Sequence, residues 1–178
     1  MKKFNRAIAV ASMASLALLA APTMNASAAG QAAAGDAIVT HCTEMLGDPD
    51  PVTGVRAVAS QTCEQMTTAE RDAEVAETST AGRGITAITL IVLFQDLNRT
   101  GNSSAISVSG SECDSAGYQF TPSSFWKTNV SSLGQGNSTC NRALLTNIAL
   151  NNSTNYVVPT NGIGIYNDNV GFMNVKKV

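Results

Sequence analysis

The second half of this chain repeatedly interrupts short apolar runs with Ser, Asn, Thr and Gly, and this pattern constrains the fold most. Residues 86–94 are β-branched and aliphatic on both faces, as in a strand buried between two layers. Ile106 and Val108 alternate with serines, which is typical of a half-exposed strand. Further strands are predicted at Tyr118 with Phe120, Leu144 with Leu145, residues 156–158, Ile163 with Ile165, and residues 172–175. Roughly six to eight short strands between Asn-Gly, Ser-Gly and Asn-Asn turns predict an all-β fold, an antiparallel sandwich of Greek keys.

The N-terminus predicts export from the cell. Lys2, Lys3 and Arg6 form a basic region, residues 7–21 are an apolar run rich in Ala and Leu, and residues 26–28 read Ala-Ser-Ala. This order is that of a signal peptide, so we expect residues 1–28 to be removed and the mature protein to be secreted. The alternative is an uncleaved membrane anchor, but the run is shorter than the ~20 residues that a spanning helix needs.

Four cysteines remain in the mature chain: Cys42, Cys63, Cys113 and Cys140. An even number in an exported chain predicts two disulfides, for which three pairings exist. We favour Cys42–Cys63 with Cys113–Cys140, because each of these pairs lies inside one compositional region. A zinc site is the rival interpretation; it is disfavoured because CxxC spacing is absent and His41 is the only histidine.

Residues 29–84 differ in composition from the rest and carry most of the mature charge. Residues 68–74 predict a short helix, with Thr67 or Thr68 as its N-cap. Residues 78–84 are typical of a linker. The prediction is therefore a small, partly helical segment (29–84) in front of a β-sandwich domain (85–178). That segment is either a helical cap or a pro-segment cut away near Arg83.

The charge excludes two classes of partner. The formal net charge is −2, and the basic residues are scattered apart from the pair Lys176 and Lys177. Nucleic acids need a concentrated basic face, and membrane surfaces need a polybasic segment. We therefore expect no nucleic acid partner, and no membrane partner after signal cleavage.

The β-region contains an internal repeat. Residues 94–101 and residues 145–152 each place an apolar residue before a polar hairpin tip, followed by Gly or Asn where a positive φ is tolerated. Residues 126–133 and residues 166–173 align without a gap as aromatic, polar triplet, Val and small residue. Each copy thus has an opening segment and a later partner segment.

These segments resemble the βγ-crystallin-like Greek-key domains of secreted bacterial proteins, and more narrowly those grouped with peptidase inhibitor family I36. The resemblance covers about the last half of the chain. It is carried by residues 94–98 with Gly101, residues 109–114, residues 126–133, residues 140–142 and residues 167–170. It implies a double Greek-key sandwich. The chain departs from the family at Arg99, where a second aromatic residue is usual.

The resemblance also raises the question of calcium. Family members often hold Ca²⁺ with paired acid or amide residues followed by Ser/Thr-Ser, and the two copies exchange ligands. Residues 127–132 keep the serines and lack the acids, whereas residues 167–172 keep the acids and lack the serines. One hybrid site formed by Ser131 and Asp168 is implied. A single carboxylate makes at best a weak site. The alternative is that these segments are only structural turns between strands. No other cofactor is expected.

The sequence favours a protein without catalytic residues. The β-region has no His, and its acids are Asp96, Glu112, Asp114 and Asp168. Acid–base hydrolysis commonly needs His with a carboxylate, or two carboxylates. Asp96 with Asp114 is the one candidate pair, and both occupy predicted turns, where Asp is favoured for local hydrogen bonding.

The resemblance implies inhibition of an extracellular peptidase, with metallopeptidases as the expected target class. A rigid, cross-linked sandwich presents a loop with little ordering cost on binding. The candidate loops are residues 122–126 and residues 134–139, and the candidate anchors are Phe125 and Trp126, because aromatic residues dominate interface energetics. The alternative for Trp126 is a place in the core.

A second hypothesis assigns the chain to another class of extracellular protein. Asn- and Ser-rich loops suit the hydroxyl groups of a cell-wall glycan, so this hypothesis is a glycan-binding or Ca²⁺-binding module on the same scaffold. A small antimicrobial toxin is a further variant. Retention on chitin or peptidoglycan separates this hypothesis from peptidase inhibition.

Overall fold

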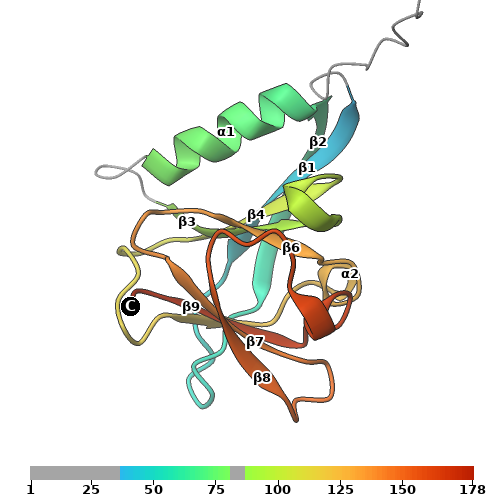
Figure 1. Ribbon diagram of the computed structural model, residues 1–178. Coiled ribbons are helices and arrows are strands. Elements are labelled where there is room, and N and C mark those ends of the chain that lie inside the picture. The colour runs from blue at the N-terminus through green and yellow to red at the C-terminus, as the bar shows by residue number, and fades with distance from the viewer. Residues whose placement is uncertain (1–36, 81–86) are drawn as a thin grey trace, which may run out of the picture. The chain divides into compact units, whose positions relative to one another are not determined.

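The computed structural model describes residues 37–80 and 87–178. The predicted signal peptide (1–28) and residues 81–84 of the predicted linker lie outside the described residues. In chain order the elements are β1 (Ile38–Leu46), β2 (Val58–Thr67), α1 (Thr68–Thr80), β3 (Ile88–Phe94), the 3-10 helix η1 (Leu97–Arg99), β4 (Ser103–Val108), β5 (Tyr118–Phe120), α2 (Ser124–Lys127), β6 (Ser132–Gln135), β7 (Arg142–Thr146), β8 (Ser153–Val157), the 3-10 helix η2 (Gly164–Tyr166) and β9 (Phe172–Lys176). The expected all-β class is confirmed (Figure 1).

The strands form two sheets. The five-stranded sheet has the order β2-β1-β4-β3-β6, and the four-stranded sheet has the order β5-β9-β7-β8. Every pair of named strands is antiparallel except β1 with β4, which run parallel from His41 opposite Ser103 to Leu46 opposite Val108. Within residues 87–178 all named pairs are antiparallel, as expected, and the parallel pair involves β1, an N-terminal strand that was not expected.

The region after residue 87 has a first half, from β3 to β6, and a second half, from β7 to β9. Each half contributes a segment to the sheet that contains the strands of the other half. β5 follows β4 in sequence, but it pairs with β9 in the four-stranded sheet. In return, Thr160 from the second half forms an antiparallel bridge with Leu133 of β6, with N–H to O distances of 3.0 and 2.9 Å. Both sheets are thus completed by residues from both halves.

The main core lies between the facing sides of the two sheets. Its largest side chains are fully buried: Trp126, Tyr166, Phe120, Leu90, Ile91, Leu93, Ile106, Leu133, Leu145, Ile163 and Met173. β4 was expected to be half exposed, yet all six of its residues are buried. The reason is that β1 pairs with it on one side, while Val75 of α1 packs against the small cluster of Val92, Phe94 and Ala105 on the opposite face of the sheet.

Helix α1 begins where the sequence predicts it. Thr67 Oγ1 accepts a hydrogen bond from the Glu70 amide (3.2 Å), and the Glu70 carboxylate accepts one from the Thr67 amide (2.8 Å). This reciprocal pair is a capping box, which satisfies two of the free N–H groups at a helix start. The helix runs on to Thr80, so the first three residues of the predicted linker belong to it.

Arg71 fixes α1 to the tip of the β3–β4 hairpin. Its side chain is 2 % exposed, lies 5.1 Å from the centroid of the Phe94 ring, and donates to the carbonyl oxygens of Gly101 (2.7 Å) and Arg99 (3.4 Å). Its remaining donors reach the carboxylate of Asp72 at 2.7 and 2.9 Å. The guanidinium is therefore buried with its hydrogen-bonding groups occupied, as burial of a charge requires.

The segment before α1 is a β-hairpin, which the sequence did not indicate. β1 and β2 pair antiparallel with Cys42 directly opposite Cys63, and these two cysteines form a disulfide. The connection between them reaches the other sheet, because the Arg56 amide donates to the carbonyl of Gln119 in β5 (2.9 Å). The hairpin therefore contacts both layers.

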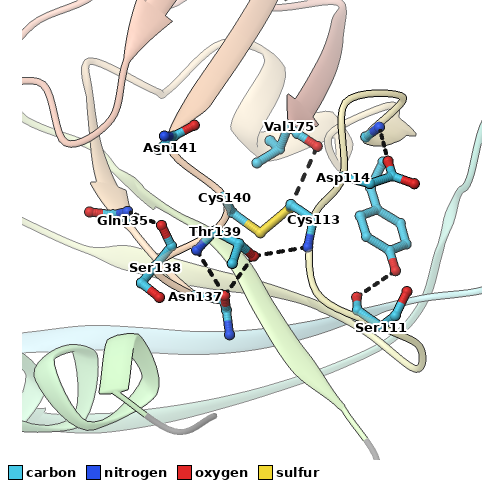
Figure 2. The surroundings of a disulfide bond; sticks show 12 residues. Ser111, Cys113, Asp114, Gln135, Asn137, Ser138, Thr139, Cys140, Asn141 and Val175 are labelled. Atoms are coloured by element: carbon cyan, nitrogen blue, oxygen red, sulfur yellow. Dashed lines mark hydrogen bonds between the residues drawn. A yellow bond between two sulfur atoms is a disulfide. The ribbon is translucent and has the colours of Figure 1, made fainter. Parts of the chain in front are cut away.

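The second disulfide, Cys113–Cys140, is buried in the main core. Figure 2 shows its surroundings: the Cys113 amide donates to Thr139 Oγ1 (3.0 Å), and the Cys113 sulfur lies 3.7 Å from the Val175 carbonyl oxygen. Both favoured pairings are thus confirmed, and the described residues contain no free cysteine.

One strand prediction is wrong. Ile163 and Ile165 were expected to lie in a strand, but they flank the start of η2, where Gly164 has a φ of 55°. Ile163 is fully buried and Ile165 is 71 % exposed. Their opposite environments gave the sequence the same alternation that a half-exposed strand has.

The described part of the chain has no helix with the length and apolar character needed to span a bilayer.

Candidate functional site

The loop of residues 134–139, one of the two candidate binding loops, is held down by the fold. Asn137 is buried, and its amide donates to the Thr89 carbonyl at 2.7 Å. Its side-chain oxygen accepts from the amide and hydroxyl of Thr139 at 2.9 and 2.8 Å (Figure 2). Gly136 packs directly against the Thr89 backbone, where an added Cβ has no room. Only Ser138 is exposed there, so this loop offers little surface to a partner.

The other candidate loop ends in α2 and presents an aromatic side chain. Phe125 is 48 % exposed, whereas the neighbouring Trp126 is 2 % exposed and belongs to the main core. Their rings meet edge to face with centroids 5.1 Å apart. The Phe125 carbonyl accepts from the Thr128 amide (3.2 Å) and from Asn129 Nδ2 (2.8 Å), so the exposed ring stands on a braced turn.

A cleft of about 290 Å³ opens beside this turn. It lies between α2 and the inward face of the β1–β2 hairpin, and it is lined by Thr40, Cys42, Gln61, Asn102, Ser103, Phe125 and Trp126. The structure therefore brings both aromatic residues singled out from the sequence against the first disulfide.

Glu44 lies behind two residues that line this cleft, Gln61 and Trp126. It is fully buried, and its Oε1 accepts hydrogen bonds from Gln61 Nε2 (3.2 Å) and Ser123 Oγ (3.4 Å). Burial raises the pKa of Glu44, and the side chains of Ser104, Ser123 and Trp126 beside the carboxylate oppose that shift. This arrangement was missed at the sequence level because Glu44 sits in a strand that was not expected.

The residues of the implied calcium site lie on adjacent segments. The Asp168 amide donates to the carbonyl of Val130 at 2.9 Å, which places Asp168 next to the residue before Ser131. Ser131 is buried, whereas Asp168 is exposed and its Oδ2 accepts from Asn167 Nδ2 at 2.8 Å. The described residues hold no group of three or more His, Cys, Asp or Glu suited to a metal ion.

A wide, open hollow of about 760 Å³ adjoins the same segments. Five of its seven lining residues have polar side chains, and the lining comes from both halves: Asp96, Leu97, Asn98, Thr100, Ser131, Gly164 and Asn167. Ser131 therefore faces a surface of amides and hydroxyls at the tip of the β3–β4 hairpin.

The two acids weighed as a catalytic pair for acid–base hydrolysis, Asp96 and Asp114, both lie in turns. Asp114 Oδ1 accepts from the amides of Ala116 (2.9 Å) and Gly117 (2.8 Å), which is an Asx turn. Asp96 precedes η1, and the Gly101 backbone packs so closely against its carboxylate that a side chain at position 101 has no space.

The only histidine is buried on the outward face of β1. His41 Nδ1 lies 2.7 Å from Ser103 Oγ, and Nε2 lies 3.9 Å from the Glu74 carboxylate of α1. Burial lowers the pKa of His41, Glu74 and Glu64 oppose this, and Arg71 adds to it. The histidine is thus part of the contact between α1 and the sheet.

Searches against protein-family models, curated proteins and solved structures each found no match for this chain.

Proposed function

We propose that this chain is a secreted, non-enzymatic inhibitor of an extracellular peptidase, with Phe125 as the residue that enters the target. The observation that carries this is the half-exposed Phe125 ring on a braced turn. A side chain already held in place loses little conformational entropy when a partner binds, and aromatic anchors dominate interface energies.

Export supports this function, and two points favour export. Both disulfides are compatible with an extracellular protein. The N-terminal sequence has the order of a signal peptide. N-terminal sequencing of the protein recovered from culture medium tests this: a start near Ala29 supports it, and an intact Met1 or a start beyond Arg83 overturns the proposed mature chain.

A double Greek-key, βγ-crystallin-like fold is part of the proposal. Supporting it, the two partner segments occupy equivalent places: Trp126 and Tyr166 are both buried aromatic residues, and Val130 and Val170 are both fully buried. The segments also bond each other, since the amide of Val170 donates to the Lys127 carbonyl at 3.0 Å. The crossing of β5 and Thr160 between the halves fits such a pair of units.

The test is a titration of a thermolysin-like metallopeptidase with the mature protein and two variants. Phe125→Ala is expected to weaken inhibition by about 30-fold, which corresponds to an anchor contribution of about 2 kcal/mol. Ile165→Ala is the matched control, because Ile165 is an exposed apolar residue just before the buried Tyr166, as Phe125 is before Trp126. Unchanged peptidase activity at micromolar excess of the wild-type protein discards the proposal.

The second candidate is a glycan- or Ca²⁺-binding module, or a toxin built on the same fold. It is favoured by the polar hollow at Asp96, Thr100, Ser131 and Asn167. Retention of the mature protein on chitin or peptidoglycan supports the glycan-binding form. The Ca²⁺-binding form is tested by calorimetry with millimolar Ca²⁺ and by the melting temperature of Asp168→Ala. If the wild-type protein gives no heat and Asp168→Ala leaves the melting temperature unchanged, the Ser131–Asp168 site is excluded.

A further inference from the structure

The two disulfides lie in opposite environments. Cys113 and Cys140 are 3 % and 0 % exposed, and both belong to the main core (Figure 2). In the other disulfide, Cys42 lines the cleft beside α2, and Cys63 is exposed on β2. Exchange between a thiol and a disulfide requires a thiolate to reach one of the two sulfur atoms. Access from solvent therefore separates the first disulfide from the second.

The strand order decides which sulfur of the first disulfide is open to attack. β2 is at the edge of the five-stranded sheet, and Cys63 lies directly opposite Cys42 of β1, so the bond runs across the two strands. A thiolate attacks in line with the bond, from the side opposite the leaving sulfur. For Cys63 that line comes from beyond the free edge of the sheet. For Cys42 it comes from β4, where Ser104 occupies the opposing position. Cys63 is thus the sulfur that a thiolate reaches.

The middle of β2 depends on this bond more than the other strands depend on a cross-link. The residues from Ala59 to Gln65 are all exposed, so this stretch buries little apolar surface on either face. Its strand hydrogen bonds go to β1 alone, because β2 has no second neighbour in the sheet. A disulfide stabilises mainly by restricting the unfolded chain. Opening this one therefore loosens β2 and leaves the main core, with Cys113–Cys140, in place.

We propose that Cys42–Cys63 is a thiol-exchange site that accepts a low-molecular-weight thiol at Cys63. The thiolate of the reagent attacks Cys63 Sγ and forms a new S–S bond to it. The Cys42–Cys63 bond breaks, and Cys42 leaves as a thiolate that takes a proton from water. This modification site goes beyond peptidase inhibition and does not depend on it. It gives the protein a chemical response to thiols in its surroundings that spares the core.

Glutathione is the probe for the main test. The oxidised mature protein is incubated with increasing glutathione at mildly alkaline pH, quenched with N-ethylmaleimide and mapped by peptide mass spectrometry. We expect glutathione on Cys63 and maleimide on Cys42, with Cys113–Cys140 intact until the glutathione concentration is at least about tenfold higher. An adduct mainly on Cys42, or opening of both disulfides at the same concentration, overturns the proposal. So does the absence of an adduct at concentrations that open the urea-unfolded protein.

Trp126 reports the same event in solution, because it is the only tryptophan and it lines the cleft together with Cys42. A neighbouring disulfide quenches indole fluorescence, so emission is expected to rise in step with the labelling of Cys42. The variant with Cys42→Ser and Cys63→Ser should begin at the raised emission and show no response to glutathione. A response in this variant contradicts the assignment. If the variant does not fold, the mapping of the wild-type protein still decides.

A charge placed beside Cys63 tests the direction of attack without removing a cysteine. Gln65 is exposed and lies two residues from Cys63, on the same face of β2. Glutathione is an anion, so Gln65→Lys should react faster than Gln65→Glu, by roughly fivefold at low ionic strength, and the difference should shrink in high salt. Thr62→Lys and Thr62→Glu, on the opposite face, are the control pair and should differ by less than about twofold. Equal rates for the two Gln65 variants contradict attack at Cys63.

Discussion

The two faces of the five-stranded sheet around β1 bury ionisable groups in different ways. On the outward face, Arg71 of α1 is buried with donors to two backbone carbonyls and to Asp72. On the inward face, Glu44 is buried with one oxygen served by neutral donors and the other without a partner. A buried charge whose hydrogen bonds are complete can hold two elements together, whereas one whose hydrogen bonds are incomplete lowers the stability of the fold.

The largest expected effect concerns Arg71, which joins α1 to the β3–β4 hairpin on the outward face. Arg71→Met keeps most of the volume but leaves the carbonyls of Gly101 and Arg99 without their donor. We expect the free energy of unfolding to fall by about 3 kcal/mol, since hydrogen bonds from a charged donor contribute about 1.5–3 kcal/mol each. Urea denaturation measures this. A loss below about 0.5 kcal/mol, the usual range for surface changes, means that Arg71 does not fasten α1.

A smaller effect is expected at the start of α1. Thr67→Ala removes the oxygen that accepts from the Glu70 amide, and it is expected to cost about 1 kcal/mol. Hydrogen exchange localises the change: amides at the start of α1 should exchange faster, while those of β7 and β9 in the other sheet stay protected. Uniform acceleration throughout the chain contradicts a local role for the cap.

The inward face is expected to respond with the opposite sign. Glu44→Gln is expected to raise the free energy of unfolding at pH 7 by on the order of 1 kcal/mol, because the buried carboxylate no longer has to ionise. Since the folded-state pKa of Glu44 is raised above its usual value of 4.5, the folded wild-type protein binds the extra proton just above that pH.

The stability of the wild-type protein should therefore fall as the pH rises from 4.5 through the raised pKa, and then level off. The variant lacks this contribution, so the difference between the two proteins should grow with pH over that window and vanish below it. Denaturation curves at several pH values measure the difference, and a difference independent of pH contradicts the assignment to Glu44.

The smallest effect concerns His41, and its pH dependence has the reverse direction. Its pKa is lowered from 6.5, so below that pH the unfolded chain binds more protons than the folded one. His41 thus contributes stability above pH 6.5 that is lost as the pH falls through the lowered pKa. His41→Gln should flatten the stability profile in this range by less than about 1 kcal/mol. An unchanged slope means that His41 does not titrate with unfolding.

The strands after residue 87 were largely predictable, because most of them alternate apolar and polar residues or bury both faces. Residues 86–94 correspond to β3, and Tyr118 with Phe120 to β5. The helix start followed from Thr67 and Glu70, whose residue types form a capping box by local contacts alone. The disulfide pairing followed from the division of the chain into two compositional regions.

The β1–β2 hairpin was not predictable from periodicity. β1 buries His41 and Glu44, so its polar residues do not mark a solvent face, and the residues of β2 are mostly exposed on both faces. The candidate site was also not predictable from the sequence. Phe125 and Trp126 were found as aromatic residues in a loop, but Gln61 and Glu44 reach them only through the long-range pairing of β1 with β4. Sequence spacing carries no information about that contact.

The crossing of β5 and Thr160 between the two halves has a consequence for fragments of the protein. A cut in the chain between Cys140 and Arg142 leaves the Cys113–Cys140 disulfide within the first piece, and it separates β5 from its neighbour β9 and Leu133 from its partner Thr160. Each piece then retains a sheet with a missing edge and an uncovered apolar side. The two pieces should be inert alone and reassemble when mixed, so this protein lends itself to fragment complementation rather than to dissection into independent modules.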